Sequence, residues 1–378
     1  MKNIGIITHN FPTSLKDRQN AGIFVNDIAQ ELAESEKVFV LTPIENNRAD
    51  KIGKVKITNF VVTKGNKLGS LRFWNPIDIL KFTAFFIGGM YYLPLFIKKN
   101  KISINIVMWA FPSGVFAYIA KKIFGIPYVV WCLGSDIYVY SKKPILKQII
   151  ERVLSNADFV FADGIDLAEK TTELSGKKCI FIPSATKASF KINMVKEKIN
   201  KIVLTFVGRM ESVKGPDILL EALFLVRNDL SKYKINFIGG GSLQVMLRQK
   251  AEKYGLGKQI NFYGNVNDFQ KISNVIAGSD WLVIPSRSDS IPLVFSEAMK
   301  VGTPIIASNL PDLKYLVNKY KVGVTFEKEN FRQLANLIVQ LPNQKKKRNR
   351  FSKNTIVAAG DFNINESARK IMDFINKI

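Results

Sequence analysis

The sequence predicts an α/β protein built from two Rossmann-like, doubly wound parallel-sheet domains that face a central cleft. Three observations support this fold class. Short β-rich apolar runs alternate with helical patterns along the chain, which is typical of parallel sheets covered by helices on both faces. The alternation stops in a polar stretch at 184–200 and then begins again. The chain has 378 residues, enough for two domains with complete cores.

Each expected element follows from its hydrophobic pattern, a compact β-branched run for a strand and a period near 3.6 for a helix. The first series has strands at 4–8, 38–43, 104–109, 128–132, 159–162 and 180–183, and helices at 22–34, 77–98, 114–124, 143–156 and 166–175. The second has strands at 202–207, 235–238, 260–263, 281–285, 304–307 and 322–326, and helices at 217–228, 242–254, 268–278, 292–301 and 331–341. A last helix near 363–377 follows no strand. The predicted domains are 1–188, completed by a C-terminal helix at about 361–378, then a linker at 189–200, then 201–360.

The composition excludes several classes of protein. Cys132 and Cys179 are the only cysteines, too few for a disulfide framework or a zinc site, and this is typical of a reducing compartment. His9 is the only histidine, which excludes a His-rich metal site. We expect neither a metal nor a cofactor. The N-terminal apolar run is too short for a signal peptide, and no 18 apolar residues run without charge, so no membrane-spanning helix is expected.

The net charge of +24 is unevenly spread along the chain. Residues 51–150 contain 15 Lys and Arg but only two acids, Asp78 and Asp136. Nucleic acid is not an expected partner, because no nucleic-acid-binding module is present. Two interpretations stay open: an anionic membrane surface, suggested by aromatics interleaved with cations, or a solvated basic face over ordinary core aromatics. On the first interpretation the membrane or acceptor face includes Trp74, Lys98, Lys99, Lys121 and Lys122.

Two acids in the second series indicate a site for a nucleotide sugar. Asp289 and Glu297 stand eight positions apart, the first on a loop after a buried strand and the second on the helix that follows. Glu297 can accept hydrogen bonds from both hydroxyls of a ribose, and the helix N-terminus favours a pyrophosphate. Arg209 and Lys214 lie on the loop after the first strand of the same series. A fork-shaped guanidinium and a mobile ammonium suit a diphosphate.

Other loops after strands give weaker signals, and each has a structural alternative. Gly240 and Val266 follow two strands of the second series and would border a ligand, or merely allow tight packing and turns. Gly22 precedes a helix and would present N–H groups to a phosphate. Asp136 is a candidate catalytic acid or a simple cap. His9 is more typical of a loop hydrogen-bonding residue than of a catalyst.

These residues together resemble the retaining glycosyltransferases of family 4, also called group-1 glycosyl transferases, which have the GT-B fold. The resemblance covers nearly the whole chain and is most specific from Val207 to Ser308. The matching motifs, in family order and spacing, are Gly208-Arg209 with Lys214-Gly215, Pro285-Ser286, Asp289 with Glu297-Ala298-Met299, and Gly302-Thr303-Pro304.

The resemblance implies roles for single residues. Arg209 and Lys214 would hold the diphosphate, Glu297 the ribose and Asp289 the transferred sugar, with Gly208, Ser290 and the backbone N–H groups of Ile291 to Leu293 nearby. Four departures from the family pattern are visible, one of them the segment Pro183 to Lys187, which replaces Pro-Asn-Gly-Val-Asp. Asp289 replaces the usual glutamate, Ser290-Ile291-Pro292 replaces Gly-Phe-Gly, and Leu133 stands where many members have a histidine.

The expected function is therefore metal-independent, retaining transfer of a sugar from a nucleoside diphosphate. UDP is the expected nucleotide and GDP the alternative. The family implies a front-face mechanism, in which the leaving phosphate takes the acceptor's proton. The basic face favours a lipid-linked saccharide acceptor for a bacterial capsule, exopolysaccharide or O-antigen, handled by an enzyme at the inner face of the cytoplasmic membrane. The alternatives are a soluble acceptor, or a non-catalytic nucleotide-sugar or lipid-binding partner of a polysaccharide assembly machine. A dehydrogenase is excluded, because no Gly-x-Gly-x-x-Gly follows the first strand.

Overall fold

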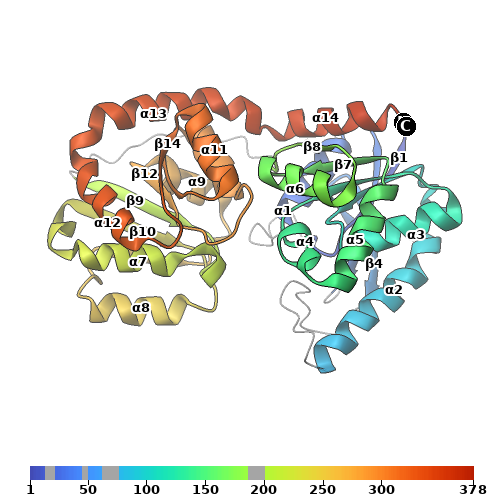
Figure 1. Cartoon of the computed structure of the whole chain (residues 1–378), viewed down its shortest axis with the longest axis horizontal. Coiled ribbons are helices and arrows are strands. Elements are labelled where there is room, and N and C mark those ends of the chain that lie inside the picture. Colours follow the sequence, from blue (N-terminus) through green and yellow to red (C-terminus); the bar gives the residue numbers. More distant parts are fainter. Residues whose placement is uncertain (13–21, 45–49, 62–75, 186–200) are drawn as a thin grey trace. The chain divides into compact units, whose positions relative to one another are not determined.

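The computed structural model describes residues 1–12, 22–44, 50–61, 76–185 and 201–378 (Figure 1). The chain divides into two compact units. The first comprises residues 1–187 and 364–378, and the second residues 188–363. The predicted linker at 189–200 and Trp74 lie outside the described residues.

The first unit is an eight-stranded sheet with the order β3-β4-β2-β1-β5-β6-β7-β8. Its strands are β1 (Asn3–Ile7), β2 (Lys37–Ile44), β3 (Lys51–Ile52), β4 (Val55–Val61), β5 (Ile104–Met108), β6 (Tyr128–Cys132), β7 (Phe159–Ala162) and β8 (Cys179–Phe181). All neighbouring strands are parallel except the hairpin of β3 and β4. This hairpin is absent from the sequence prediction. Val55 and Ile57 of β4 are buried while Lys56 between them is exposed, so this strand has one face in the core and one face open to solvent, unlike the fully buried central strands.

The helices of the first unit are α1 (Ile23–Leu32), α2 (Pro76–Asn100), α3 (Gly114–Phe124), α4 (Ser135–Tyr138), α5 (Pro144–Asn156), α6 (Ile165–Ser175) and α14 (Ile364–Ile375). One core joins the sheet to α2, α3, α5 and α6 through Phe85, Phe116, Ile150 and Leu167. The C-terminal helix α14 contacts α1, and Phe374 packs on Phe159 and Phe161 of β7. Ser367 Oγ also donates to the carbonyl of Pro183 at 3.0 Å. The last helix of the chain therefore belongs to the first unit.

The second unit is a six-stranded, fully parallel sheet with the order β11-β10-β9-β12-β13-β14. Its strands are β9 (Ile202–Val207), β10 (Tyr233–Ile238), β11 (Ile260–Gly264), β12 (Trp281–Ile284), β13 (Ile305–Ser308) and β14 (Gly323–Phe326). Its α-helices are α7 (Pro216–Leu225), α8 (Gln244–Lys253), α9 (Phe269–Ala277), α10 (Leu293–Val301), α11 (Pro311–Tyr320), α12 (Phe331–Gln340) and α13 (Lys345–Ala358). One core packs α7, α8 and α12 on the strands through Leu219, Leu247 and Leu334.

Two helices of the second unit were not expected. The run of cations that opens α13 obscures a helix whose buried contacts come later, at Phe351, Thr355 and Ala358. The helix α11 begins at Pro311, and its buried residues include Leu313 and Leu316. The apolar face of α13 is weak, and the hydrophobic pattern does not separate it from a loop. The helix α11 has Leu313, Leu316 and Val317 at helical spacing, which the sequence prediction overlooked.

No membrane-spanning helix was expected from the sequence, and one helix of the described residues is nevertheless long and apolar enough to cross a membrane by length and composition. Residues Asp78–Asn100 of α2 form a segment of 23 residues that contains an 18-residue window with mean hydropathy 1.4. Only one side of α2 enters the core, where Phe85, Leu93 and Phe96 are buried. Gly89 lies so close to Phe116 that a Cβ would stand 2.2 Å from its ring. This helix is therefore docked on the first unit along one face.

Two glycines in the left-handed region allow a test of how tightly the second unit packs its loops. Gly215 has φ +66°, and a Cβ there would stand 2.0 Å from the carbonyl oxygen of Pro285. Gly255 has φ +71°, and nothing lies within 4 Å of its Cβ position. We expect Gly255→Ala to cost about 1 kcal/mol of stability, from backbone conformation alone. Gly215→Ala should cost roughly 1–3 kcal/mol more, because the Pro285 backbone must move. Urea unfolding of the two variants measures the difference, and equal midpoints would contradict this packing.

Candidate functional site

The loops at the carboxyl edge of the second sheet bring two of the predicted residues, Lys214 and Asp289, together. The loop after β9 contains a short 3-10 turn, Ser212–Lys214, and ends at Gly215, where α7 begins. The loop after β12 carries Asp289. Lys214 Nζ donates to both carboxylate oxygens of Asp289, at 2.6 and 2.8 Å. The left-handed Gly215 places the two loops in backbone contact at Pro285. This contact brings the side chains of Lys214 and Asp289 within reach of each other.

The pair of Lys214 and Asp289 is partly open to solvent. Their side chains are 22% and 16% exposed. An ion pair at this depth gains more from attraction than a surface pair does, while its atoms stay within reach of a ligand. An arriving phosphate would compete for the ammonium and release the carboxylate for a hydroxyl. The arrangement is therefore suited to a ligand that carries both a phosphate and a polyol.

Arg287 fixes the two loops, and sequence reasoning assigned it no role. Its Nη1 donates to the carbonyl of Ser212 at 2.7 Å, and its guanidinium forks onto both oxygens of Asp217 at 2.8 and 2.7 Å. Its Nε reaches Glu329 at 2.8 Å. The hydrogen bonds with Asp217 raise the pKa of Arg287 above its ordinary value, so this cation is permanent. Sequence alone does not pair residues seventy positions apart, so this contact could not be predicted.

Glu297 lies in the middle of α10 and is 7% exposed. The helix begins at Leu293 after Pro292, which has extended backbone angles and serves as its N-cap. Ser290 and Ile291, just before the helix, are also buried. The N–H groups of a first helical turn have no acceptor within the helix. This end of α10, beside the loop of Asp289, therefore suits an anion.

The glycine loops at the same edge pack on one another. Gly208 donates its N–H to the Ile238 carbonyl at 3.0 Å, and a Cβ on Gly239 would stand 2.0 Å from the Gly208 oxygen. The Gly240 carbonyl accepts from the N–H of Met210 at 2.7 Å, and a Cβ on Gly240 would stand 2.4 Å from the side chain of Asn265. Glycine is therefore required at positions 239 and 240 because neighbouring loops pack directly against them.

The two remaining second-unit predictions lie at this edge as well. Arg209 is exposed on the loop after β9, and Val266 is partly exposed on the loop after β11. Glu211 accepts hydrogen bonds from the N–H of Ser242 at 2.8 Å and from its hydroxyl at 2.6 Å. This acid therefore ties the loop of Arg209 to the glycine loop. Sequence reasoning did not identify that role.

The predicted residues of the first unit have mainly structural contacts. Gly22 precedes α1, and a Cβ there would stand 2.3 Å from the Asn10 carbonyl oxygen, so the close approach requires glycine. His9 Nδ1 lies 2.9 Å from Ser113 Oγ, and its ring packs on Trp109 at 4.6 Å. Burial lowers the pKa of His9 to about 4, so its imidazole is neutral near pH 7.

Asp136 is fully buried and supports a loop. Its Oδ2 accepts the N–H of Ala110 at 2.8 Å, and its Oδ1 accepts that of Leu133 at 3.3 Å. These bonds join the loops after β5 and β6. Burial raises the pKa of Asp136 to about 6, against the opposing effect of its backbone hydrogen bonds. The contacts are those of a capping residue, the structural alternative weighed for it above.

The basic residues predicted for a membrane face differ in their contacts. Lys98, Lys99 and Lys122 are exposed. Lys121 Nζ instead donates to Asp158 at 2.7 Å and to the carbonyl of Asn156 at 3.0 Å. It therefore ties α3 to the turn after α5 and is the weakest candidate of the four for contact with a lipid.

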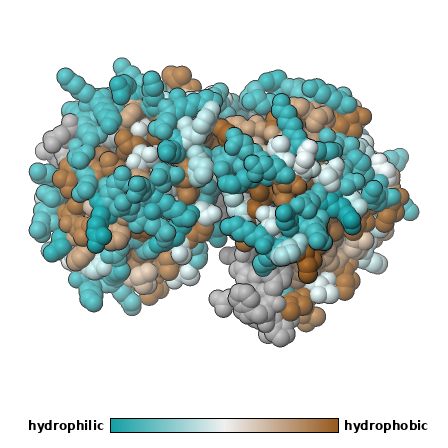
Figure 2. Space-filling model, in the orientation of Figure 1, coloured by the Kyte–Doolittle hydropathy of each residue, from teal (hydrophilic) through white to brown (hydrophobic). Residues whose placement is uncertain are grey.

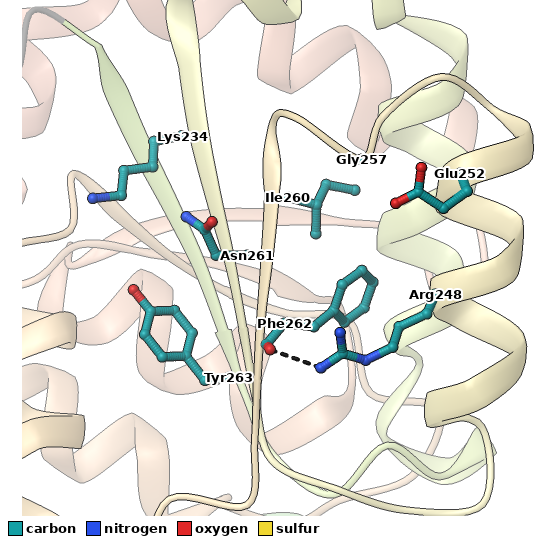
Figure 3. A pocket seen from close by; sticks show the side chains of 8 residues that line it. All are labelled: Lys234, Arg248, Glu252, Gly257, Ile260, Asn261, Phe262 and Tyr263. Carbon is teal, nitrogen blue, oxygen red and sulfur yellow. Dashed lines mark hydrogen bonds between the residues drawn. The ribbon is translucent and has the colours of Figure 1, made fainter.

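A separate hollow of about 530 Å³ lies beside the edge strand β11 (Figure 3). Arg248 of α8 reaches across it to the carbonyl of Phe262 at 2.8 Å. Its lining, which also includes Lys234, Glu252 and Tyr263, contains none of the predicted site residues. Among the residues that the structure describes, no group of three or more His, Cys, Asp and Glu side chains is arranged to hold a metal ion.

Comparison with known proteins shows which family and which fold this chain resembles. Residues 189–357 match the model of the family "Glycosyl transferases group 1". The whole chain aligns with sucrose-phosphate synthase from Thermosynechococcus elongatus, with TM-score 0.78 and 18% identity over 100% of this chain and 99% of that one. It also aligns with Anabaena HepE in complex with UDP, with TM-score 0.73 and 17% identity over 100% of both chains. Residues 189–357 are therefore similar to the group 1 glycosyl transferases, and the whole chain has the two-domain GT-B fold of these solved structures, as the sequence predicted.

Two curated relatives match part of the chain. The chain is 29% identical to a UDP-Gal:alpha-D-GlcNAc-diphosphoundecaprenol alpha-1,3-galactosyltransferase of Escherichia coli, over 49% of this chain and 45% of the relative. It is 36% identical to an uncharacterized 41.2 kDa protein in the cps region of Klebsiella pneumoniae, over 36% of this chain and 35% of that protein. The matched stretches thus span less than half the length of these relatives.

The contacts of Asp136 generate a prediction about stability. Asp136→Asn should destabilise the first unit by about 1–3 kcal/mol. The NH2 group of the asparagine would face one of the two backbone N–H groups that now donate to the Asp136 side chain. The folded pKa of Asp136 lies above its ordinary value, so ionisation opposes folding as the pH rises from about 4 to about 6. The advantage of the wild type over the variant should therefore be largest near pH 4 and shrink towards pH 7. Urea unfolding across this range measures it, with the exposed Glu169→Gln as control. A variant as stable as the wild type at pH 4 would contradict the capping role.

Proposed function

We propose that the protein transfers a sugar, with retention of configuration, from a nucleoside diphosphate to a lipid-linked saccharide. The observation that carries the proposal is the pair of Lys214 and Asp289 at the carboxyl edge of the second sheet, beside the N-terminus of α10. Ligands of doubly wound sheets bind at this edge. The match of residues 189–357 to the family of group 1 glycosyl transferases supports a transferase and the choice of a nucleotide sugar as donor.

In this proposal each residue acts on one part of the donor. Lys214 and Arg209 neutralise the diphosphate as it leaves, which lowers the barrier by electrostatic stabilisation of developing charge. Asp289, released from Lys214, accepts hydrogen bonds from hydroxyls of the transferred sugar. Glu297 holds the ribose. The departing phosphate takes the acceptor's proton, so the reaction needs no separate base. Because Lys214 and Arg209 neutralise the diphosphate, it needs no divalent metal.

The proposed donor is a UDP-sugar, with a GDP-sugar as alternative, and the acceptor is an undecaprenyl-diphosphate-linked saccharide of a capsule, exopolysaccharide or O-antigen. The E. coli relative, whose name includes a UDP-sugar and a diphosphoundecaprenol acceptor, supports this choice. The Klebsiella relative encoded in a capsule region supports the same context. Such an acceptor is held in a membrane, so we propose a cytoplasmic enzyme peripheral to the inner face of that membrane.

The direct test is a panel of labelled UDP- and GDP-sugars with a short-chain prenyl-diphosphate saccharide as acceptor, in EDTA. We expect transfer from one donor, undiminished by EDTA, and a product whose anomeric configuration by NMR matches that of the donor. Inversion would contradict the mechanism, and an absolute requirement for a divalent metal would contradict metal independence. Failure to hydrolyse any donor, even slowly and without acceptor, would favour the non-catalytic alternative. Transfer only to soluble sugars would favour the soluble-acceptor alternative.

The site assignment predicts the effects of single substitutions. Glu297→Gln and Lys214→Ala should each lower kcat/KM by roughly 30- to 1,000-fold, because a charge-assisted contact in the transition state contributes about 2–4 kcal/mol. Asp289→Ala should change the preference among donor sugars as well as the rate. The exposed Lys258 precedes β11, at the opposite edge of the sheet, and Lys258→Ala serves as the matched control. Steady-state kinetics with folding checked by circular dichroism measure these effects. Near-normal turnover of Glu297→Gln would overturn the assignment.

A further inference from the structure

The helix α2 carries apolar side chains on two different sides. One side enters the core of the first unit through Phe85, Leu93, Phe96 and Ile97, which are all buried. The other carries an outer stripe of Leu80, Ile87, Tyr91 and Leu95, which are 65%, 67%, 69% and 52% exposed. Intervals of seven, four and four residues keep these four on one line along the helix. At 1.5 Å per residue the stripe is about 22 Å long.

An exposed stripe of this kind indicates a partner. Single apolar side chains are common at protein surfaces, but aligned ones mark a surface that another molecule covers. Ile79 and Met90 of the same helix are also exposed, at 48% and 36%. Figure 2 shows brown, hydrophobic surface over the lower part of the first unit, where Figure 1 places α2.

The charges around the stripe select the kind of partner. No Asp or Glu occurs between residues 79 and 135. Lys98, Lys99 and Lys101 are exposed where α2 ends, and Lys122 is exposed on the neighbouring α3. A partner that covers the stripe must therefore accept apolar side chains and balance positive charge at one end. The surface of an anionic bilayer meets both demands, since its acyl boundary lies directly beneath negatively charged headgroups.

The buried side of α2 argues against a helix that spans the membrane. The helix is long and apolar enough to cross a membrane by composition. Crossing would pull Phe85, Leu93 and Phe96 out of the core of the first unit, where they pack with strands and with Phe116 of α3. A helix held by one side and apolar on the other is suited to lie in the plane of the interface.

We propose that α2 docks the first unit on an anionic lipid surface, with the outer stripe in the acyl boundary and Lys98, Lys99, Lys101 and Lys122 at the headgroups. The inference rests on the peripheral location proposed above and specifies the surface responsible for it. It assigns the apolar anchor to the stripe and omits Lys121, which is engaged by Asp158.

Vesicle flotation tests the docking surface. The wild type should bind phosphatidylcholine vesicles increasingly as phosphatidylglycerol is added, and less as salt rises. A variant with Leu80, Ile87, Tyr91 and Leu95 all changed to Gln should lose at least about tenfold in partition coefficient, because apolar burial drives insertion. A variant with the four lysines changed to Gln should lose up to roughly 1,000-fold on anionic vesicles only, since each cation near the surface contributes about 1 kcal/mol.

The matched control changes four exposed apolar residues elsewhere to Gln. Ile145, Val245, Ile356 and Val357 are 75%, 66%, 61% and 82% exposed and lie outside α2. This control should bind vesicles as the wild type does. Hydrolysis of a soluble donor should be unchanged in all three variants, which separates a failure of docking from a failure of the proposed function.

Three results would overturn the proposal. The first is equal vesicle binding by the stripe variant and the wild type. The second is retention of the wild type on vesicles after an alkaline carbonate wash, which indicates a spanning helix. The third is a dimer of the wild type in sedimentation that the stripe variant loses without a change in lipid binding, which makes the stripe an interface between copies of this chain.

Discussion

The backbone contact between Gly215 and Pro285 is the constraint on which the candidate site depends. The strands β9 and β12 are neighbours in the second sheet, so the loops at their carboxyl ends begin side by side. Only a glycine with φ +66° lets the first loop press against the carbonyl of the second. Arg287 then joins the loops through Ser212 and Asp217. Lys214 and Asp289 meet because the backbone beneath them is fixed.

This constraint gives the site its chemistry. A lysine beside a carboxylate is held in place before a ligand arrives, so less side-chain freedom is lost on binding. The same pairing makes ligand binding less favourable, since a phosphate must compete with Asp289 for Lys214. In the proposed function the competition is more favourable when the released carboxylate finds a new partner. A nucleoside diphosphate that carries a sugar supplies that partner, whereas the bare nucleotide does not.

Sequence reasoning succeeded where a single element determines the result. The buried strands from β5 to β7 and the helix α3 lie where the apolar pattern placed them, and Asp289 and Glu297 fall on the loop and helix expected. It failed where a residue's role depends on contacts with residues far away in the sequence. The role of Arg287 depends on Asp217 and Glu329, and that of Asp136 on the backbone at Ala110. The helix α13 was missed because its cations dominate the first turns, while Phe351 and Thr355 make its contacts.

Calorimetric titration with UDP and with the UDP-sugar tests the central claim most directly. Lys214→Ala should weaken the binding of both ligands, because both carry the diphosphate. Asp289→Asn should leave UDP binding equal or tighter, since it frees the lysine, and should weaken binding of the UDP-sugar. This opposite response of the two ligands is what an exchange of partners at Lys214 requires. If Lys214→Ala binds UDP as the wild type does, or if Asp289→Asn weakens both ligands alike, the account is contradicted.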